Sequence, residues 1–274
     1  MKIADAFSHK AIFQGQAMEN LKKDHLLMDL HSHTKYSHDS RASIKDILKR
    51  AKSLGIGMAV TDHLQAKGAV EACRQKKVPV IPGIEILAKE NKEIILYFYS
   101  ARDLVDFYEK RVKNHKLAQK APESVLRRSL LSVRCLVPME DLVSYADDYN
   151  CVKCIPHPYA YLHRNSSKFF AKRKETLKKI ECVEVINSTL RPGQNRKALR
   201  WATKMNKAYT AGSDAHMAKQ LGRSLTAARV DTTGEFLDAI RKKHAIIFGN
   251  EMRRREALSN ILAMNKVKRS KEWN

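Results

Sequence analysis

Three histidines and two aspartates lie within the twelve residues DLHSHTKYSHDS, which run from Asp29 to Ser40. His31 and His33 stand two positions apart, directly after the apolar run LLMDL. Imidazoles mixed with carboxylates form a ligand set that suits Zn, Mn or Fe. The segment therefore predicts that this part of the chain contributes to a metal site.

The same combination recurs at the ends of four other short apolar runs. These runs have the length and composition of buried β-strands, and each is followed by a histidine, a carboxylate or both. In a parallel α/β barrel the carboxyl ends of the strands meet at one rim, so we expect the five sets to lie together. The further residues are Asp62 and His63 after GMAVT, Glu85 after VPVIPGI, His157 after CVKCIP, and Asp214 and His216 after AYTAGS.

Such a cluster supports metal-assisted hydrolysis. A central carboxylate can bridge two ions, which stabilise the attacking and leaving oxygens in phosphoryl transfer, with a metal-bound hydroxide as the nucleophile. A thiolate-rich zinc site is not favoured, because Cys151 and Cys154 form one C-x-x-C with no second pair at zinc-ribbon spacing. We interpret that pair as part of a buried strand.

The apolar pattern predicts an α/β fold in which strands and helices alternate. This alternation indicates a parallel sheet, and about seven or eight such units favour a closed barrel over an open doubly wound sheet. No G-x-G-x-x-G motif or P-loop follows any of the runs. The predicted strands are 26–30, 57–61, 78–84, 94–100, 151–156, 182–187, 208–213 and 245–248; the predicted helices are 44–55 capped by Ser43, 139–149 opened by Pro138, and 234–244 preceded by Thr233.

One domain, residues 25–250, accounts for this alternation. It carries a helical insertion at about 101–150, whose run KRVKNHKLAQK is basic. Residues 1–24 contain no clear strand and are expected to form an N-terminal arm. Residues 251–274 are predicted to form a basic, amphipathic C-terminal helix or tail.

The composition predicts a folded, strongly basic protein. Hydrophobic residues make up 43% of the 274 residues, which is too many for a disordered chain. No apolar run could span a bilayer or serve as a signal peptide, and the five cysteines suit a reducing compartment, so we expect a soluble cytoplasmic protein that binds no membrane. The net charge of +23 attracts polyanions and favours a phosphorylated partner, a nucleotide or a nucleic acid. A basic composition that only serves solubility is the alternative.

Seven motifs occur in order between about residues 26 and 230, namely DLHSHTKYSHDS, AVTDHL, IPGIEI, IPHPY, VEVINS, TAGSDAHM and LGRSLTAA. Together they resemble the PHP (polymerase and histidinol phosphatase) superfamily of metal-dependent phosphoesterases. The resemblance implies a single PHP domain, a distorted (β/α)7 TIM-like barrel with two or three divalent ions (Mn, Zn or Fe) at its rim.

The resemblance also implies which residues bind the ions and act in catalysis. A first ion would be held by the two histidines of the H-x-H pair and one aspartate. A second ion would be held by one histidine, and a glutamate would bridge the first and second ions. A third ion would be held by two histidines and an aspartate. The implied ligands are His31, His33 and Asp214 for the first ion, His157 for the second, Glu85 as the bridge, and Asp39, His63 and His216 for the third; Glu85, Asp214 and His216 are the implied catalytic residues.

Two positions depart from the family pattern. The acidic ligand of the first motif falls on Asp39 or on its neighbour His38, and Asp39 is preferred. Ile95 stands where the family often has a histidine, and an isoleucine cannot bind a metal. Either the second ion is weakly held with water in that place, or the enzyme uses two ions, or this strand is misaligned. Asp62 is expected to act indirectly, as a partner of a ligand imidazole or as a structural residue.

The predicted activity is hydrolysis of a phosphomonoester or phosphodiester, with a preference for a nucleotide or oligonucleotide because of the positive charge. Lys35, Arg191 and Arg223 follow strand ends or flank ligands and are candidates to bind the substrate phosphate. A small-molecule phosphatase of the histidinol-phosphate type is one alternative. A nucleic-acid-binding protein on a degenerate PHP scaffold, which Ile95 would favour, is another.

Overall fold

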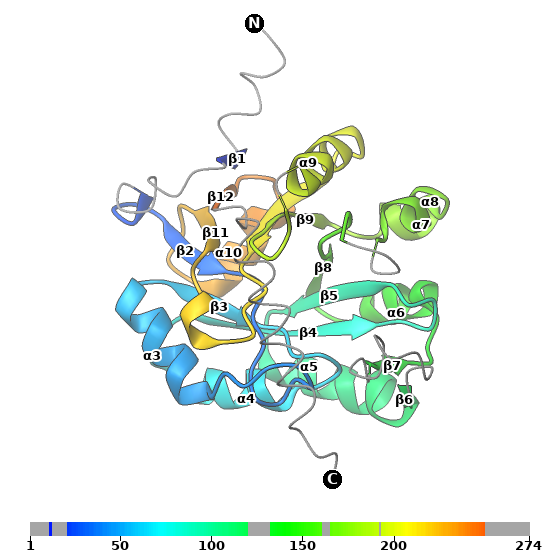
Figure 1. The fold of residues 1–274 in the computed structure, drawn as a ribbon, viewed down its shortest axis with the longest axis horizontal. Helices are drawn as coiled ribbons and strands as arrows, with labels where there is room; N and C mark the ends of the chain where they lie inside the picture. Colours follow the sequence, from blue (N-terminus) through cyan, green and yellow to red (C-terminus); the bar gives the residue numbers. More distant parts are fainter. Residues whose placement is uncertain (1–10, 13–20, 120–131, 161–164, 192, 250–274) are drawn as a thin grey trace, which may run out of the picture.

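The computed structural model describes residues 11–12, 21–119, 132–160, 165–191 and 193–249. Ten strands form one sheet that curls into a nearly closed barrel, with helices around its outside (Figure 1). The predicted α/β fold class and barrel are therefore confirmed. In the order of the sheet the strands are β1 (Ala11–Ile12), β12 (Ile246–Gly249), β11 (Ser224–Ala228), β2 (Leu26–Asp29), β3 (Gly57–Val60), β4 (Val80–Leu87), β5 (Glu93–Phe98), β8 (Cys151–Ile155), β9 (Cys182–Asn187) and β10 (Ala208–Gly212).

The barrel closes where β10, the last strand of the sheet, meets β11 and the segment after β2. The amide of Leu30, just after β2, donates to the carbonyl of Ala211 at 3.3 Å, and the amide of Ala211 donates to Thr226 Oγ1 on β11 at 2.9 Å. These contacts bring the segments after β2 and β10 side by side. Both segments carry predicted metal ligands.

The sheet is mixed, so the expectation of a parallel sheet is only partly correct. Strands β2, β3 and β4 are parallel, as are β8, β9 and β10. Strand β5 runs antiparallel to both its neighbours, and β11 runs antiparallel to β2 and β12. The reversal of β5 follows from its connection to β4, a short hairpin in which the Ala88 amide donates to the Lys92 carbonyl at 2.8 Å, because a tight turn can join only antiparallel strands.

Two strands of the sheet were not predicted, the two-residue β1, which pairs with β12 in the region expected to contain no clear strand, and β11. The β11 sequence SLTAA is small and buried along its whole length, so it shows neither a bulky apolar run nor alternation. The other predicted strands agree with the structure within a few residues at each end.

The helices begin where their capping residues predict. Helix α3 (Ile44–Leu54) starts at Ser43, whose hydroxyl accepts from the Asp46 amide at 3.1 Å, and ends at Gly55, whose φ of 63° suits a residue without a Cβ. Helix α10 (Thr233–Arg241) starts at Thr232, one residue before the expected position, because Thr232 and Glu235 form a capping box. The remaining helices of the barrel are α4 (Lys67–Arg74), α6 (Met139–Ala146), α7 (Ser167–Ala171), α8 (Lys174–Lys178), α9 (Gln194–Lys204) and the short η5 (Ala218–Gln220).

Residues 101–150 are only partly helical. Helix α5 (Ala101–Phe107) continues into η2 (Tyr108–Val112) and η3 (Lys113–His115), and strands β6 (Lys116–Gln119) and β7 (Ser132–Cys135) then form an antiparallel pair before α6. Most of residues 1–24 and all of residues 251–274 lie outside the described residues, so the predicted arm and C-terminal helix stay predictions. None of the helices within the described ranges is both long and apolar enough to cross a membrane.

The apolar core has two parts, separated by the barrel wall. Outward-facing residues such as Ile84, Ile86 and Leu96 pack against the surrounding helices. Inward-facing residues fill the interior, where Phe236 and Ile240 of α10 pack against the starting ends of several strands. Helix α10 therefore closes one end of the barrel, and the polar residues described next occupy the other.

Candidate metal centre

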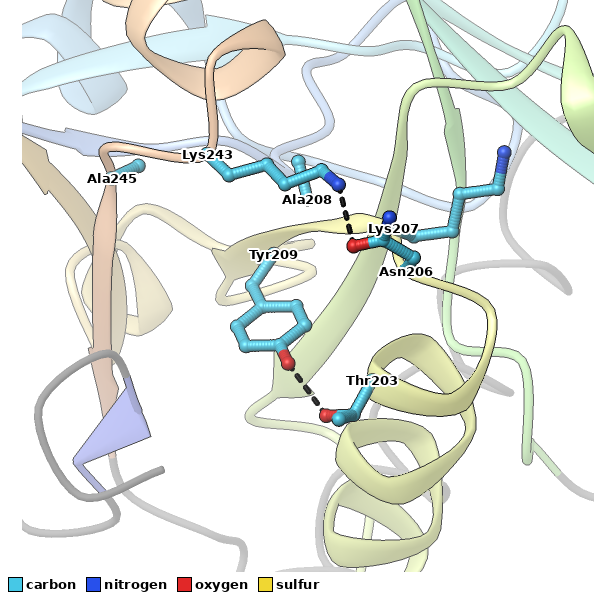
Figure 2. Close-up of a pocket in the computed structure, with 7 residues that line it drawn as sticks. All are labelled: Thr203, Asn206, Lys207, Ala208, Tyr209, Lys243 and Ala245. Carbon is cyan, nitrogen blue, oxygen red and sulfur yellow. Dashed lines mark hydrogen bonds between the residues drawn. The ribbon is translucent and has the colours of Figure 1, made fainter. Parts of the chain in front are cut away.

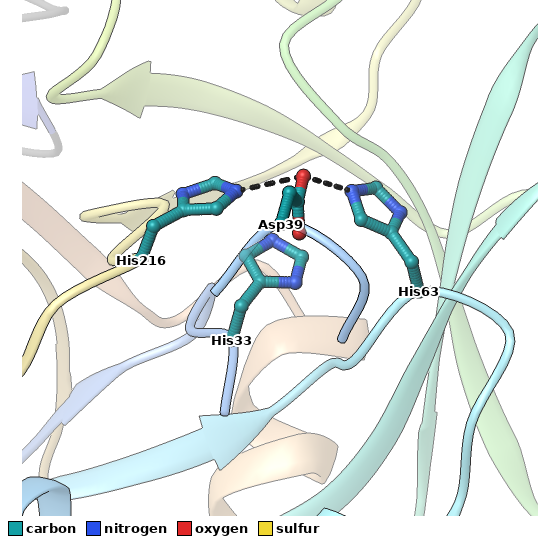
Figure 3. A group of neighbouring side chains, drawn as sticks. All are labelled: His33, Asp39, His63 and His216. Atoms are coloured by element: carbon teal, nitrogen blue, oxygen red, sulfur yellow. Dashed lines mark ion pairs between the residues drawn. The ribbon is translucent and has the colours of Figure 1, made fainter. Parts of the chain in front are cut away.

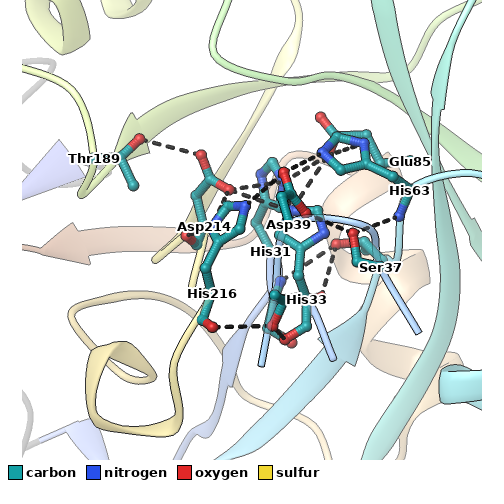
Figure 4. Close-up of polar contacts among 12 residues, drawn as sticks. His31, His33, Ser37, Asp39, His63, Glu85, Thr189, Asp214 and His216 are labelled. Atoms are coloured by element: carbon teal, nitrogen blue, oxygen red, sulfur yellow. Dashed lines mark hydrogen bonds and ion pairs between the residues drawn. The ribbon is translucent and has the colours of Figure 1, made fainter. Parts of the chain in front are cut away.

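All eight predicted ligands are buried and lie in one cluster. Figure 4 labels seven of them, and the eighth, His157, contacts Glu85. Strands β2, β3, β8 and β10 each end just before one or two of them, as the strand-end rule predicts. Glu85 is an exception, since β4 continues to Leu87 and Glu85 projects inward from within the strand. The structure thus brings together side chains that are as far as 185 positions apart in the sequence, from His31 to His216.

Glu85 lies at the centre of the cluster. Its Oε2 is 3.2 Å from His31 Nε2, 3.4 Å from His33 Nε2 and 3.3 Å from His63 Nδ1. Its Oε1 is 3.2 Å from His157 Nε2. The two carboxylate oxygens therefore face different imidazoles, which is the arrangement expected of a bridging ligand.

The donor atoms fall into groups in which every atom lies within 4.8 Å of the others. Figure 3 shows the group that surrounds Asp39. Several residues belong to two groups, so neighbouring ions would share ligands. The groups are His33, Asp39, His63 and His216; His31, His33 and Asp214; His31, Glu85 and His157; and His63, Glu85 and Glu93.

Asp39, rather than His38, points into the cluster. Asp39 Oδ2 is 3.1 Å from His216 Nε2 and 3.3 Å from His63 Nε2, and its Oδ1 accepts from the Ser37 hydroxyl at 2.7 Å. The His38 ring lies beside that of His63, with the two centroids 5.0 Å apart, and its Nε2 is 3.9 Å from Asp39 Oδ2. Asp39 belongs to a group of donor atoms and His38 does not, which agrees with the preference for Asp39, but the assignment stays a prediction.

Glu184, on β9, was not predicted, yet it holds two of the candidate ligands. His31 Nδ1 donates to Glu184 Oε1 at 2.9 Å, and the His157 amide and the Asn187 side chain donate to Oε2 at 2.8 and 3.0 Å. A carboxylate that accepts from a ligand imidazole fixes its orientation and increases its basicity. The available signal was a single charged residue in the buried run CVEVIN.

Asp62 acts on the loop that carries the first ligands. Its carboxylate accepts from the Thr34 amide at 2.5 Å and from the Thr34 hydroxyl at 2.7 Å, directly after His33. Burial raises the pKa of Asp62 to about 6, against the effect of these hydrogen bonds. Of the two roles expected for Asp62, these contacts support the structural one.

Two features of the backbone show how tightly the cluster is built. A Cβ on Gly212 would lie 2.3 Å from the Cβ of His31, so only glycine fits there. His157 and Asp214 have positive φ angles of 26° and 52°, which side chains of L-residues rarely adopt and which cost free energy. The fold therefore accepts local strain at two of the candidate ligands.

Ile95 lies directly opposite Glu85 in the β4–β5 register and is fully buried. This placement agrees with the alignment that puts an isoleucine at a ligand position of the family. Glu93, two residues earlier, faces the same side of β5 and joins a donor group with His63 and Glu85. Sequence analysis missed Glu93, because it assumed that the end of each strand, not its start, lies at the rim.

The carboxylates of the cluster are charged. Burial alone would raise the pKa of Glu85, yet the nearby imidazoles of His63 and His31 hold it well below its usual value. The same imidazole-rich surroundings keep the pKa values of Asp39 and Asp214 well below 3.8, against burial. The site therefore concentrates negative charge that needs cationic partners.

The imidazoles divide into two kinds. Burial lowers the pKa of His33 to about 4, with help from His216, so its imidazole is neutral at pH 7. For His63, burial acts in the same direction, but Glu85 and Asp39 outweigh it and raise the pKa to about 9. Without metal, protons on imidazoles such as His63 supply the positive charge that the carboxylates require.

The residues fit divalent metal ions. Asp214 Oδ1 is buried and lacks a hydrogen-bond partner among the described residues, although His33 Nε2 and His31 Nε2 lie 3.2 and 3.6 Å away. A buried carboxylate oxygen surrounded by imidazole nitrogens is satisfied by a shared cation. The mixture of nitrogen and oxygen donors suits Zn, Mn or Fe.

The three candidate phosphate ligands lie outside the buried cluster. Lys35 and Arg191 are exposed, and Arg223 is half-buried beside Gly222, whose amide donates to Asp29. Lys35 Nζ lies 5.1 Å from the centre of the Tyr36 ring. Their role in binding phosphate stays a prediction.

A separate small cavity of about 130 Å³ lies where α9 ends and β10 begins (Figure 2). Tyr209 and Thr203 are hydrogen-bonded in its lining, as are Lys243 and Asn206. None of these residues belongs to the donor groups at the rim. We therefore assign the cavity no part in the metal centre.

Known proteins agree with this architecture. A sequence family described as PHP-associated matches residues 192–244. Among solved structures, a two-domain protein from Bacteroides vulgatus with a predicted PHP-like metal-dependent phosphoesterase superposes with a TM-score of 0.57 at 14% identity, covering 87% of this chain and 69% of its own. The chain has the PHP fold. This is the fold that the resemblance of the sequence motifs implies.

Three further solved structures are similar in fold to this chain. The lesion-specific endonuclease Q from Pyrococcus furiosus has a TM-score of 0.60 and 19% identity over 81% of this chain, which spans only 57% of that enzyme. PsfC from Pseudomonas syringae has a TM-score of 0.58 and 15% identity over 90% of this chain and 99% of its own. An endonuclease Q complex with a 27-mer duplex carries an abasic lesion at the active site; its TM-score is 0.60, with 16% identity over 83% of this chain and 60% of that one. No sequence among curated proteins matches the chain.

Proposed function

We propose that this chain is a metal-dependent phosphoesterase that hydrolyses a phosphate ester at the rim of its barrel. The observation that carries the proposal is the position of Glu85, whose two oxygens face separate sets of imidazoles at 3.2–3.4 Å. A shared carboxylate between two ligand sets is the geometry of a site that holds ions side by side, as two-metal phosphoesterases require.

The chain's own residues would hold and order the ions. His31, His33 and Asp214 would bind the first, His157 would bind a second that shares Glu85, and Asp39, His63 and His216 would bind a third. When bound, such ions polarise a phosphoryl oxygen and lower the pKa of water.

Glu184 would keep His31 in the tautomer whose Nε2 faces the ions, because it accepts the proton on Nδ1. Asp62 would hold the loop that presents His33. Burial of the cluster excludes bulk water, which strengthens every charge interaction inside it.

The substrate that we propose is a nucleotide or an oligonucleotide. The net charge of +23 favours a polyanion over a small monoanion. Lys35, Arg191 and Arg223 are the residues that we propose to contact phosphate groups. The similar endonuclease Q structure holds a DNA duplex, which supports the same substrate class for this fold.

A panel of substrates tests this proposal. Phosphate release is measured with Mn or Zn on 5′-phosphorylated single-stranded RNA, nucleoside bisphosphates and histidinol phosphate, with the wild type and Glu85→Gln compared. We expect the wild type to release phosphate from the nucleotide or RNA substrates, and we expect the Glu85→Gln variant to release none. A strong preference for histidinol phosphate would overturn the substrate class. Absence of both bound metal and phosphate release would favour the non-catalytic nucleic-acid-binding alternative.

A further inference from the structure

We propose that Glu93 is a metal ligand, and that it provides the protein ligand that Ile95 cannot. It would complete the coordination of the ion shared by His157 and Glu85. This inference rests on the proposed metal centre and assigns it a residue that the strand-end pattern does not indicate.

The direction of β5 places Glu93 at the rim. Strand β5 runs antiparallel to β4 and β8. Its first residue therefore lies at the same end of the barrel as the last residues of β4 and β8, which is the end that carries the candidate ligands. Side chains alternate along a strand, so Glu93, Ile95 and Tyr97 all face inward. Tyr97 and Ile95 belong to the apolar interior, and Glu93 is the first inward-facing residue above it.

The contacts of Glu93 connect it to the second ion's ligands. Its Oε2 is 3.6 Å from His157 Nε2, and the same nitrogen is 3.2 Å from Glu85 Oε1. Glu93 also forms a donor group with Glu85 and His63, in which the ligand atoms lie within 4.8 Å of one another. The Glu93 residue is only 5% exposed. A divalent ion among these atoms would offset the charge of two neighbouring buried carboxylates, in addition to the nearby His157 imidazole.

The exchange of an imidazole for a carboxylate changes the chemistry of the ion. A carboxylate adds one negative charge and a hard oxygen donor, which shifts preference toward Mn, whereas imidazole suits Zn. We therefore expect the ion beside His157 to be the one most selective for Mn.

The test compares metal content in four forms of the full chain. Glu93→Gln keeps the shape of the side chain and removes its charge. Glu175→Gln is the matched control, because it makes the same change on an exposed residue that pairs with Lys178, outside the donor groups found among the described residues. The double variant Glu93→Gln with Ile95→His places an imidazole opposite Glu85, at the position suggested by the register. Metal equivalents and Kd are measured by elemental analysis and calorimetry with Mn and Zn, and folding by circular dichroism.

We expect Glu93→Gln to lose one equivalent of metal, or to bind its weakest ion roughly 10–100-fold less tightly, while Glu175→Gln behaves as the wild type. The double variant should regain that equivalent and prefer Zn. Unchanged metal content and Kd in a folded Glu93→Gln variant would overturn the inference. Because the readout is metal binding, a wild type that binds metal but releases no phosphate would refute the proposed function and leave the role of Glu93 intact.

Discussion

The two ends of the barrel interior are equally buried but chemically opposite. At the end closed by α10, inward-facing side chains such as Met28, Val152 and Phe236 are apolar. At the rim, the same strands lead into His31, His157 and their neighbours, which are polar or charged and less than a tenth exposed. A distance of a few residues along one strand separates a hydrophobic core from a concentration of charge.

The two ends of the barrel interior therefore contribute differently to the stability of the fold and to the proposed activity. Burial of apolar surface stabilises the α10 end at about 25 cal/mol per Å². Burial of carboxylates costs free energy unless protons or metal ions compensate for the charge. We therefore expect the rim, but not the α10 end, to depend on metal for both stability and activity.

The largest effect is expected from Glu85→Gln at the rim. The substitution keeps the shape of the side chain and removes the charge that would be shared between ions, so turnover should fall by roughly 10³-fold or more. The fold should persist, because the apolar interior is unchanged. Phosphate release measures the loss of turnover, and circular dichroism measures whether the variant is folded. Turnover at the wild-type rate would show that the metal centre lies elsewhere.

At the opposite end, Phe236→Ala should lower the free energy of unfolding by about 3–5 kcal/mol, because it leaves a cavity in the closed interior. The loss should be the same with and without metal, since Phe236 packs in the apolar interior and no residue of α10 belongs to the donor groups. Urea unfolding in the presence of Mn and of chelator measures it. A loss that appears only in one of the two conditions would mean that the two ends are coupled.

Removal of metal should lower the free energy of unfolding only through the residues of the rim. An ion present at about 100 times its Kd stabilises the folded state by about 2.7 kcal/mol, and a chelator should abolish this contribution. The midpoint of thermal unfolding should fall accordingly in the wild type. In Glu85→Gln the shift should be much smaller, so an equal shift in both proteins would contradict the assignment of Glu85.

A smaller effect is expected from Glu184→Gln, which weakens the hydrogen bond to His31 Nδ1. Partners of this kind contribute roughly 10–100-fold to metal affinity, so Kd should rise within that range while the metal-free stability changes little. Glu175→Gln again serves as the control. Calorimetric titration that shows unaltered metal affinity would remove Glu184 from its orienting role.

The sequence predicts the rim well where a strand runs in the common direction. His31, His63, His157 and Asp214 were found because a polar residue after an apolar run marks a strand end in a parallel barrel. Glu93 escaped this rule because β5 is reversed by a hairpin, and its start, not its end, reaches the rim.

The other misses have the same origin in three-dimensional context. Glu184 lies inside β9, and only the closure of the barrel brings it to His31. Strand β11, SLTAA, is built mostly from small residues that are all buried, so it leaves no local pattern of bulky apolar residues. Local periodicity reports which face is buried, but it does not report strand direction or what lies across the barrel.

The most direct test of a metal centre shared through Glu85 is anomalous X-ray scattering from crystals of the Mn-loaded protein. The account predicts separate peaks on the two sides of the Glu85 carboxylate, each within about 2.0–2.3 Å of imidazole nitrogens or carboxylate oxygens of the rim. Anomalous peaks only at other sites, or no peak beside Glu85 in crystals soaked with excess Mn, would contradict it.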